Sequence, residues 1–88
     1  MKAELYILEL SNHQYYVGST ADFDRRIDEH RNGRVISTKG KLPIKVVFRK
    51  KFSSLKQARQ VEYKIKSYKN RQIISNIVSE QKIKFLGA

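Results

Sequence analysis

The sequence contains no cysteine and no tryptophan, and it has a single proline and only two histidines among its 88 residues. The absence of cysteine excludes disulfide bonds, thiolate chemistry and cysteine-based zinc sites. His13 and His30 are too few for a zinc site built from histidine alone. No apolar run approaches the ~20 residues of a transmembrane helix, and the N-terminal residues, with acids at Glu4 and Glu9, do not resemble a signal peptide. We therefore expect a cytoplasmic protein that does not associate with membranes.

Acidic residues are also scarce, because 8 Asp and Glu residues stand against 19 Lys and Arg residues, which gives a net charge of +11 at pH 7. Residues 1–43 carry a net charge of +1 and residues 44–88 carry +10, with Glu62 and Glu80 as the only acids of the second half. Such clustering favours a polyanionic partner, since binding of phosphates releases their counterions. The simpler interpretation is that the charge only keeps a small domain in solution. We expect a nucleic acid, DNA or RNA, as the partner.

The length limits the kind of site that the chain can build. A chain of 88 residues forms one domain, and it buries only about 60–65% of its unfolded surface. A deep, enclosed active site is therefore excluded, and any chemistry lies on an open face or groove. We place the domain at residues 1–78 and treat residues 79–88 as a C-terminal tail, helical or flexible.

The residue patterns predict an α+β domain, a small three-stranded antiparallel sheet flanked by helices. Residues 3–10 and 14–17 are typical of a β-hairpin. Ser19 or Thr20 is expected to cap a helix over residues 21–32, which Gly33 ends. Residues 34–42 are predicted to form a loop that ends at Pro43.

The second half begins with an alternating segment, residues 44–52, that predicts a third strand. Ser53 and Ser54 then precede a long helix with an apolar stripe, and residues 70–78 predict a short further helix. The core-facing positions expected for the strand are Ile44, Val46, Phe48 and Phe52, with Lys45, Arg49 and Lys51 pointing away. The helix stripe consists of Leu55, Ala58, Val61, Ile65 and Tyr68.

Glu62 is a candidate metal ligand, because it is one of two acids in a half-chain with twelve basic residues. A lone carboxylate on a phosphate-binding surface repels DNA unless a divalent cation lies between them. Mg²⁺ is commonly held by one or two carboxylates together with waters and phosphate oxygens. The alternative is an ion pair between Glu62 and Lys66 on the helix surface, worth only about 0.3–0.5 kcal/mol.

Two further sets of residues are candidates for phosphate chemistry. Asp22, Arg26 and His30 recur every four residues on one helix face, where an arginine and a histidine can grip a phosphate. The alternative is a solvated face on which Asp22 pairs with Arg26. Tyr6 and Tyr16 lie on the predicted hairpin, where tyrosine usually packs across strands. A phenol, with a pKa of about 10, acts as a base only where cations favour the phenolate.

The order of these residues resembles the GIY-YIG nuclease domain. Leu5-Tyr6-Ile7 is followed by Tyr16-Val17-Gly18 and then by a helix with an Arg-Arg pair and His30. Three further elements are similar to the short stand-alone bacterial members: Ser37-Thr38-Lys39, Pro43, and the pattern Ala58, Glu62, Lys66. The resemblance covers residues 3–76, and the chain is also similar to the N-terminal nuclease domain found in excision-repair nucleases.

The resemblance implies a role for each matching residue. Tyr16 would be the general base that activates water, with Tyr6 assisting or orienting it. Arg26 would stabilise the pentacovalent phosphate, and His30 would hydrogen-bond a phosphate oxygen or the network around the nucleophile. Glu62 would be the sole protein ligand of one Mg²⁺ or Mn²⁺ ion. A further catalytic asparagine would be Asn76 or Asn70, and the expected nucleic-acid contacts are Arg25, Lys39, Lys45, Arg49 and Lys66.

The chain departs from the family pattern at two positions. Leu5 replaces the leading glycine of the first motif, and Ser19 stands where the excision-repair members carry a lysine. Arg25 or Lys66 would then have to supply the positive field next to Tyr16. Because no DNA-recognition segment accompanies the motifs, little base readout is expected.

We therefore expect a divalent-metal-dependent endonuclease that hydrolyses DNA phosphodiester bonds, with specificity for structure rather than sequence. Its substrates would be branched, nicked or flapped DNA, as in DNA repair. The alternative is a basic DNA- or RNA-binding module that is catalytically silent or that acts only with a partner. The paired tyrosines and Glu62 favour the enzyme, because phosphate binding alone needs neither.

Overall fold

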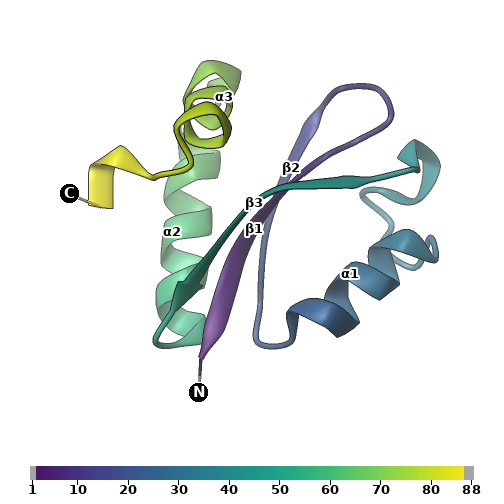
Figure 1. Cartoon of the computed structure of the whole chain (residues 1–88), viewed down its shortest axis with the longest axis horizontal. Helices are drawn as coiled ribbons and strands as arrows, with labels where there is room; N and C mark the ends of the chain where they lie inside the picture. The colour runs from purple at the N-terminus through teal and green to yellow at the C-terminus, as the bar shows by residue number, and fades with distance from the viewer. Residues whose placement is uncertain (1, 87–88) are drawn as a thin grey trace.

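The computed structural model describes residues 2–86. Strands β1 (Ala3–Glu9), β2 (Tyr15–Thr20) and β3 (Lys45–Phe52) form one antiparallel sheet in the order β2-β1-β3. Helix α1 (Phe23–Arg31) lies on one side of the strands, and α2 (Leu55–Ser67) with α3 (Arg71–Glu80) lies on the other, as Figure 1 shows. Short 3₁₀ turns occupy Lys39–Lys41 and Lys84–Leu86. The predicted α+β class, with a three-stranded antiparallel sheet flanked by helices, is confirmed.

The central strand β1 is buried on both faces. Leu5 and Ile7 pack against α2 and α3 in one core cluster, whereas Tyr6 and Leu8 pack against α1 in a second cluster. None of these four side chains is more than 1% exposed. A strand covered on both faces has no solvent-facing positions, which explains the uninterrupted apolar run in the sequence. This burial places Tyr6 inside the protein, on the α1 face.

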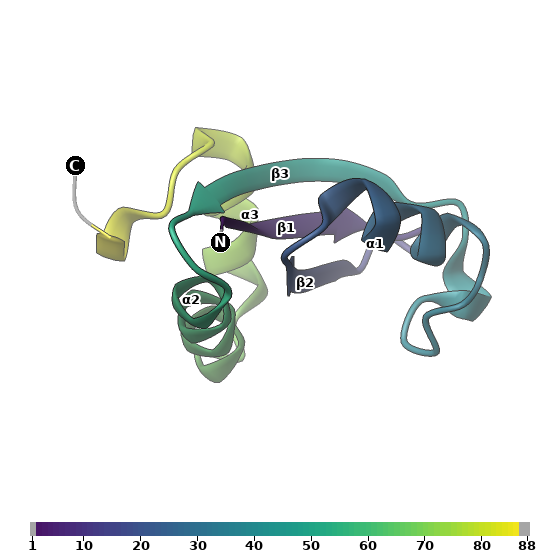
Figure 2. The ribbon, with the colours of Figure 1, turned by 90° about the horizontal axis from the view of Figure 1, so that it is seen from below.

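Strand β3 curves across the sheet (Figure 2) and changes the face that its apolar residues use. Ile7 pairs with Phe48 and Leu8 pairs with Val46, so Val47 is an extra residue, a β-bulge. Phe48 packs with the α2 and α3 cluster, whereas Val46 packs with the α1 cluster. The prediction that Ile44, Val46, Phe48 and Phe52 share one face is therefore wrong. The prediction assumes that side chains alternate strictly between the two faces, and the extra residue of a bulge breaks that alternation.

The ends of α1 differ from the prediction. The Oδ1 atom of Asp22 accepts a hydrogen bond from the backbone N–H of Arg25 at 3.2 Å, so Asp22 is the N-cap and α1 begins at Phe23. Thr20 instead accepts from the backbone N–H of Asp22 at 3.0 Å. The capping role predicted for Ser19 or Thr20 is wrong, because an Asp stands closer to the first turn. Gly33 has a φ of 70° just beyond the end of the helix, where a left-handed residue is expected.

The C-terminal residues belong to the packed domain. Helix α3 continues to Glu80, two residues beyond its predicted end, so a domain boundary at residue 78 cuts through the helix. Ile83 is 3% exposed and belongs to the same core cluster as Leu5 and Ile7. The described part of residues 79–88 is therefore folded against the core. Within residues 2–86, no helix is long and apolar enough to cross a membrane.

Candidate active site

The two tyrosines meet on the α1 face of the sheet. Tyr6 pairs with Gly18 and Leu8 pairs with Tyr16 across β1 and β2, so the tyrosine rings lie diagonally, with their centroids 6.4 Å apart. A Cβ atom added to Gly18 would lie 2.5 Å from both Cζ and the hydroxyl oxygen of Tyr6. The glycine of the second motif therefore leaves the space that the Tyr6 phenol fills.

A buried hydrogen-bond chain holds Tyr6 in place. The Tyr6 hydroxyl lies 2.9 Å from Nε2 of His30, and Nδ1 of His30 lies 2.9 Å from Oγ1 of Thr38. The Thr38 hydroxyl donates to the carbonyl oxygen of Val35 at 3.4 Å. Since Thr38 uses its hydrogen there, His30 carries its proton on Nδ1, and its Nε2 accepts from the Tyr6 hydroxyl. The chain runs in one direction, from the phenol to a backbone carbonyl.

Burial fixes the protonation states in this chain. His30 and Thr38 have no exposed surface, and Tyr6 is 1% exposed. Burial, with a contribution from the Arg26 charge, lowers the pKa of His30 to about 4, so the imidazole is neutral at pH 7. Burial raises the pKa of Tyr6 to about 12, although the nearby Arg26 guanidinium opposes the shift. Tyr6 is therefore a fixed, protonated donor, and His30 serves the tyrosine network because it cannot reach a phosphate.

Arg26 lies at the surface end of this cluster. Its Nη1 donates to Oε1 of Glu29 at 3.0 Å, and its side chain is 37% exposed. The hydrogen bond to Glu29 raises the pKa of Arg26 above its ordinary value. The alternative pairing of Arg26 with Asp22 is not formed. A permanently charged, partly exposed guanidinium beside two phenols is suited to phosphate oxygens.

Glu62 approaches the same strand from its other side. It lies on α2, where its Oε1 accepts from the Ser19 hydroxyl at 2.5 Å and its Oε2 accepts from Lys66 Nζ at 2.6 Å. Lys66 Nζ also lies 5.6 Å from the centroid of the Tyr16 ring. β2 is an edge strand, and Lys66 is the group that lies near both the Glu62 carboxylate and the Tyr16 ring. Lys66 thus connects Glu62 with Tyr16, and Ser19 orients the carboxylate.

The donor set around Glu62 fits one divalent ion. Each carboxylate oxygen accepts one hydrogen bond, which leaves lone pairs for a metal. The ion pair between Glu62 and Lys66, which is the alternative interpretation of this carboxylate, is formed at Oε2. Within residues 2–86, no group of three or more His, Asp or Glu side chains could hold a metal. A single carboxylate completed by waters and phosphate oxygens is a common way to bind Mg²⁺.

Arg49 has a structural partner rather than a free guanidinium. Its Nε and Nη2 donate to the two carboxylate oxygens of Glu4 at 2.8 and 2.9 Å, and its Cζ lies 3.6 Å from the centroid of the Phe23 ring. The bonds to Glu4 raise the pKa of Arg49. Arg49 therefore ties β3 to β1 and to the start of α1. Of the other predicted contacts, Arg25 lies 3.9 Å from Glu29, and Lys39 and Lys45 are exposed.

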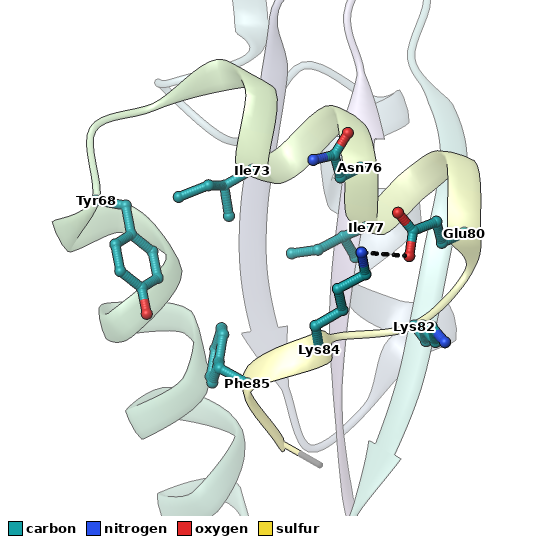
Figure 3. A pocket seen from close by; sticks show the side chains of 8 residues that line it. All are labelled: Tyr68, Ile73, Asn76, Ile77, Glu80, Lys82, Lys84 and Phe85. Atoms are coloured by element: carbon teal, nitrogen blue, oxygen red, sulfur yellow. Dashed lines mark ion pairs between the residues drawn. The ribbon is translucent and has the colours of Figure 1, made fainter. Parts of the chain in front are cut away.

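The structure does not bring Asn76 to the tyrosines. Asn76 lines a cavity of about 280 Å³ with Ile77 and Phe85, between α3 and the C-terminal segment (Figure 3). Its Oδ1 accepts from Gln72. Asn70 caps α3 and lines a different pocket that also contains Tyr16, so it is the closer of the two asparagines.

Sequence reasoning missed the role of Thr38 as the partner of His30. Thr38 stands out only within a short stretch that resembles the family, and it lies in the loop beyond α1, so no helical or strand pattern relates it to His30. The sequence offers no local pattern that would connect a loop hydroxyl to a helix histidine.

The open sheet edge thus carries paired phenols, a partly exposed arginine and one carboxylate. The chain belongs to the GIY-YIG family, whose catalytic-domain model matches residues 2–75. This match confirms the expected membership. The members of the family are nucleases that act on DNA and generally depend on a divalent metal.

Curated relatives carry the name UPF0213 protein. The Streptococcus pneumoniae protein is 35% identical over 72 residues, which span 81% of this chain and 73% of the relative. The protein BH0048 of Halalkalibacterium halodurans is 36% identical over 72 residues, 81% of this chain and 77% of the relative. The solution NMR structure of the UPF0213 protein BH0048 from Bacillus halodurans matches with a TM-score of 0.62 and 32% identity, and the match covers 97% of this chain and 90% of that one.

Proposed function

We propose that this chain is a divalent-metal-dependent endonuclease of the cytoplasm that hydrolyses DNA phosphodiester bonds and selects its substrate by structure rather than sequence. One observation carries the proposal: Lys66 lies 2.6 Å from Glu62 and 5.6 Å from the Tyr16 ring centroid, at an open edge of the sheet. A base, a cation and a metal-binding carboxylate are thus within reach of one phosphate. A module that only binds phosphate has no use for the carboxylate or for the paired phenols.

Tyr16 is the general base in this mechanism. As a phenolate, which the positive charges of Lys66 and Arg26 stabilise before the reaction, Tyr16 takes the proton of the attacking water and becomes a neutral phenol. Tyr6 and His30 position it, because their rings lie 6.4 and 5.1 Å from the Tyr16 ring, centroid to centroid. Arg26 also binds the oxygens of the phosphate on which negative charge develops.

Glu62 would hold one Mg²⁺ or Mn²⁺ ion, with the Ser19 hydroxyl orienting its carboxylate. When bound, the ion acts as a Lewis acid on the scissile phosphate and neutralises the leaving oxygen. The exposed cations Arg25, Lys39 and Lys45 bind the DNA backbone. Backbone contacts carry no direct sequence information, which is why we propose structure-specific cutting.

Nicking of supercoiled plasmid with Mg²⁺ or Mn²⁺ tests the proposal. Glu62→Gln should abolish nicking, and Arg26→Ala should lower the rate by about 10²–10³-fold, the usual effect of one lost transition-state donor. Glu80→Gln is the matched control, because Glu80 pairs with Lys84 at 3.3 Å beside the other cavity. It should nick like the wild type. Binding of DNA should persist in Glu62→Gln, since that change removes a repelling charge.

A wild-type protein that binds DNA but nicks nothing with either metal contradicts the proposal. That result favours a basic DNA- or RNA-binding module that is catalytically silent or partner-dependent. Glu62→Gln nicking at the wild-type rate contradicts it as well. Either outcome leaves the family membership untouched, because membership does not rest on activity.

A further inference from the structure

A second concave surface adjoins the candidate active site, where the end of α2 meets the start of α3 beside the edge strand β2. We call it the corner pocket, and its volume is about 510 Å³. Its lining includes Tyr15, Tyr16, Lys66, Lys69, Asn70 and Arg71. Because Tyr16 and Lys66 also belong to the candidate active site, a group bound in the corner pocket lies directly beside the proposed base.

The rim of the corner pocket is positively charged. Lys66, Lys69 and Arg71 contribute to the lining, and no acidic residue does. Across residues 2–86, neither Lys69 nor Arg71 takes part in any of the ion pairs. The backbone N–H of Lys69 donates to the carbonyl oxygen of Lys66 at 3.2 Å, which fixes the turn that carries its side chain. Two unneutralised cations next to the active site favour an anionic ligand.

The lining of the corner pocket is also partly apolar and aromatic. Val17, Ile65 and Ile74 line it together with the two tyrosines. The Arg71 guanidinium carbon lies 4.6 Å from the centroid of the Tyr15 ring, so a cation–π contact holds the guanidinium at the wall. A phosphate group alone gains no binding energy from an apolar surface. A nucleotide uses both parts, because its base contacts apolar and aromatic surface while its phosphates contact the cations.

The bases of a DNA duplex are stacked inside the helix and cannot enter such a pocket, whereas an unpaired base can. We propose that the corner pocket binds an unpaired nucleotide of the DNA substrate next to the bond that is cut, and that this contact selects flapped or branched DNA. The inference rests on the proposed function, because a substrate preference matters only if the protein cuts DNA. It identifies the residues that determine which DNA structure is bound. Lys69 and Arg71 bind the phosphates of the unpaired strand, and the base contacts the partly exposed Tyr16 and Ile74.

The test is DNA binding without divalent metal, measured by fluorescence anisotropy in EDTA. Two labelled DNAs share one nicked duplex, and only one of them carries a single-stranded flap at the nick. We expect the wild type to bind the flapped DNA about tenfold more tightly, which corresponds to ~1.4 kcal/mol. Lys69→Gln combined with Arg71→Gln should remove this preference. The control combines Lys56→Gln with Arg59→Gln, which removes the same charge from a separate groove on α2 and should weaken both DNAs equally.

The inference is overturned if the wild type binds the two DNAs with equal affinity. It is also overturned if the Lys69→Gln, Arg71→Gln double variant prefers the flapped DNA as strongly as the wild type does. Circular dichroism verifies that each variant is folded. If the double variant does not fold, Lys69→Gln alone, at an exposed side chain, should lose part of the preference. Because no metal is present, the outcome is separate from cutting. A protein that prefers flaps but never nicks refutes only the proposed function, and one that nicks plasmid without preferring flaps refutes only the pocket.

Discussion

Replacement of Gly18 by alanine tests the packing that positions the first tyrosine. The added Cβ would lie 2.5 Å from Cζ and from the hydroxyl oxygen of Tyr6, and 3.0 Å from Cε1. The Tyr6 ring cannot move aside freely, because it is 1% exposed and its hydroxyl is bonded to His30 at 2.9 Å. Either the strands separate or the phenol leaves its partner. In both cases the displaced group is the one that supports Tyr16.

The magnitude follows from two contributions. Overpacking of a core costs about 1–3 kcal/mol, and the loss of a buried hydrogen bond adds ~0.5–1.5 kcal/mol. We expect Gly18→Ala to lower the free energy of unfolding by about 1.5–4.5 kcal/mol, measured by urea denaturation with circular dichroism. The matched control is Gly40→Ala, since a Cβ at Gly40 meets nothing within 4 Å. That change should stay within ~0.5 kcal/mol of the wild type. If Gly18→Ala is as stable as Gly40→Ala, the close contact with Tyr6 does not govern the site.

Two further predictions concern the surroundings of the site. Burial lowers the pKa of His30 to about 4, whereas the unfolded chain protonates histidine at about pH 6.5, so the unfolded state binds more protons between these values. The stability that the neutral His30 contributes should therefore be fully present above about pH 6.5 and should be lost as the pH falls toward about 4. Denaturation midpoints measured across this pH range should show the loss in the wild type, and His30→Gln should lack this contribution to the pH dependence. The bidentate pair of Arg49 with Glu4 is half exposed on the arginine side, so a double-mutant cycle through Arg49→Gln and Glu4→Gln should give a coupling of about 1 kcal/mol or less. A coupling energy above ~2 kcal/mol would show that the Arg49–Glu4 pair behaves as a buried ion pair rather than as a surface one.

The elements of the fold could be predicted because their determinants are local. The apolar run around Tyr6 and the turn at residues 11–13 specify the hairpin, and Ser54 caps α2 as its position indicates. The bulge at Val47 could not be predicted, because it depends on which residues of β1 pair with β3. The consequence was a wrong face for Ile44 and Val46.

For the candidate site, the sequence predicts a set of residues but not their arrangement. The motif order identified Tyr6, Tyr16 and Glu62, yet it could not show that His30 is fully buried and bonded to Thr38. Nor could composition show that Arg49 is engaged by Glu4, since charge counts do not reveal pairs 45 residues apart. Contacts between distant segments decide which charged groups remain available to a substrate.

The most direct test of the central claim is the nicking rate of Tyr16→Phe with saturating Mg²⁺ or Mn²⁺. Loss of a general base typically lowers a rate by about 10²–10⁴-fold, and the proposed mechanism predicts a loss of that size with unchanged DNA affinity. Tyr63→Phe is the matched control, because Tyr63 is 76% exposed on α2 and should nick like the wild type. A Tyr16→Phe protein that nicks plasmid at the wild-type rate would contradict the assignment of Tyr16 as the base.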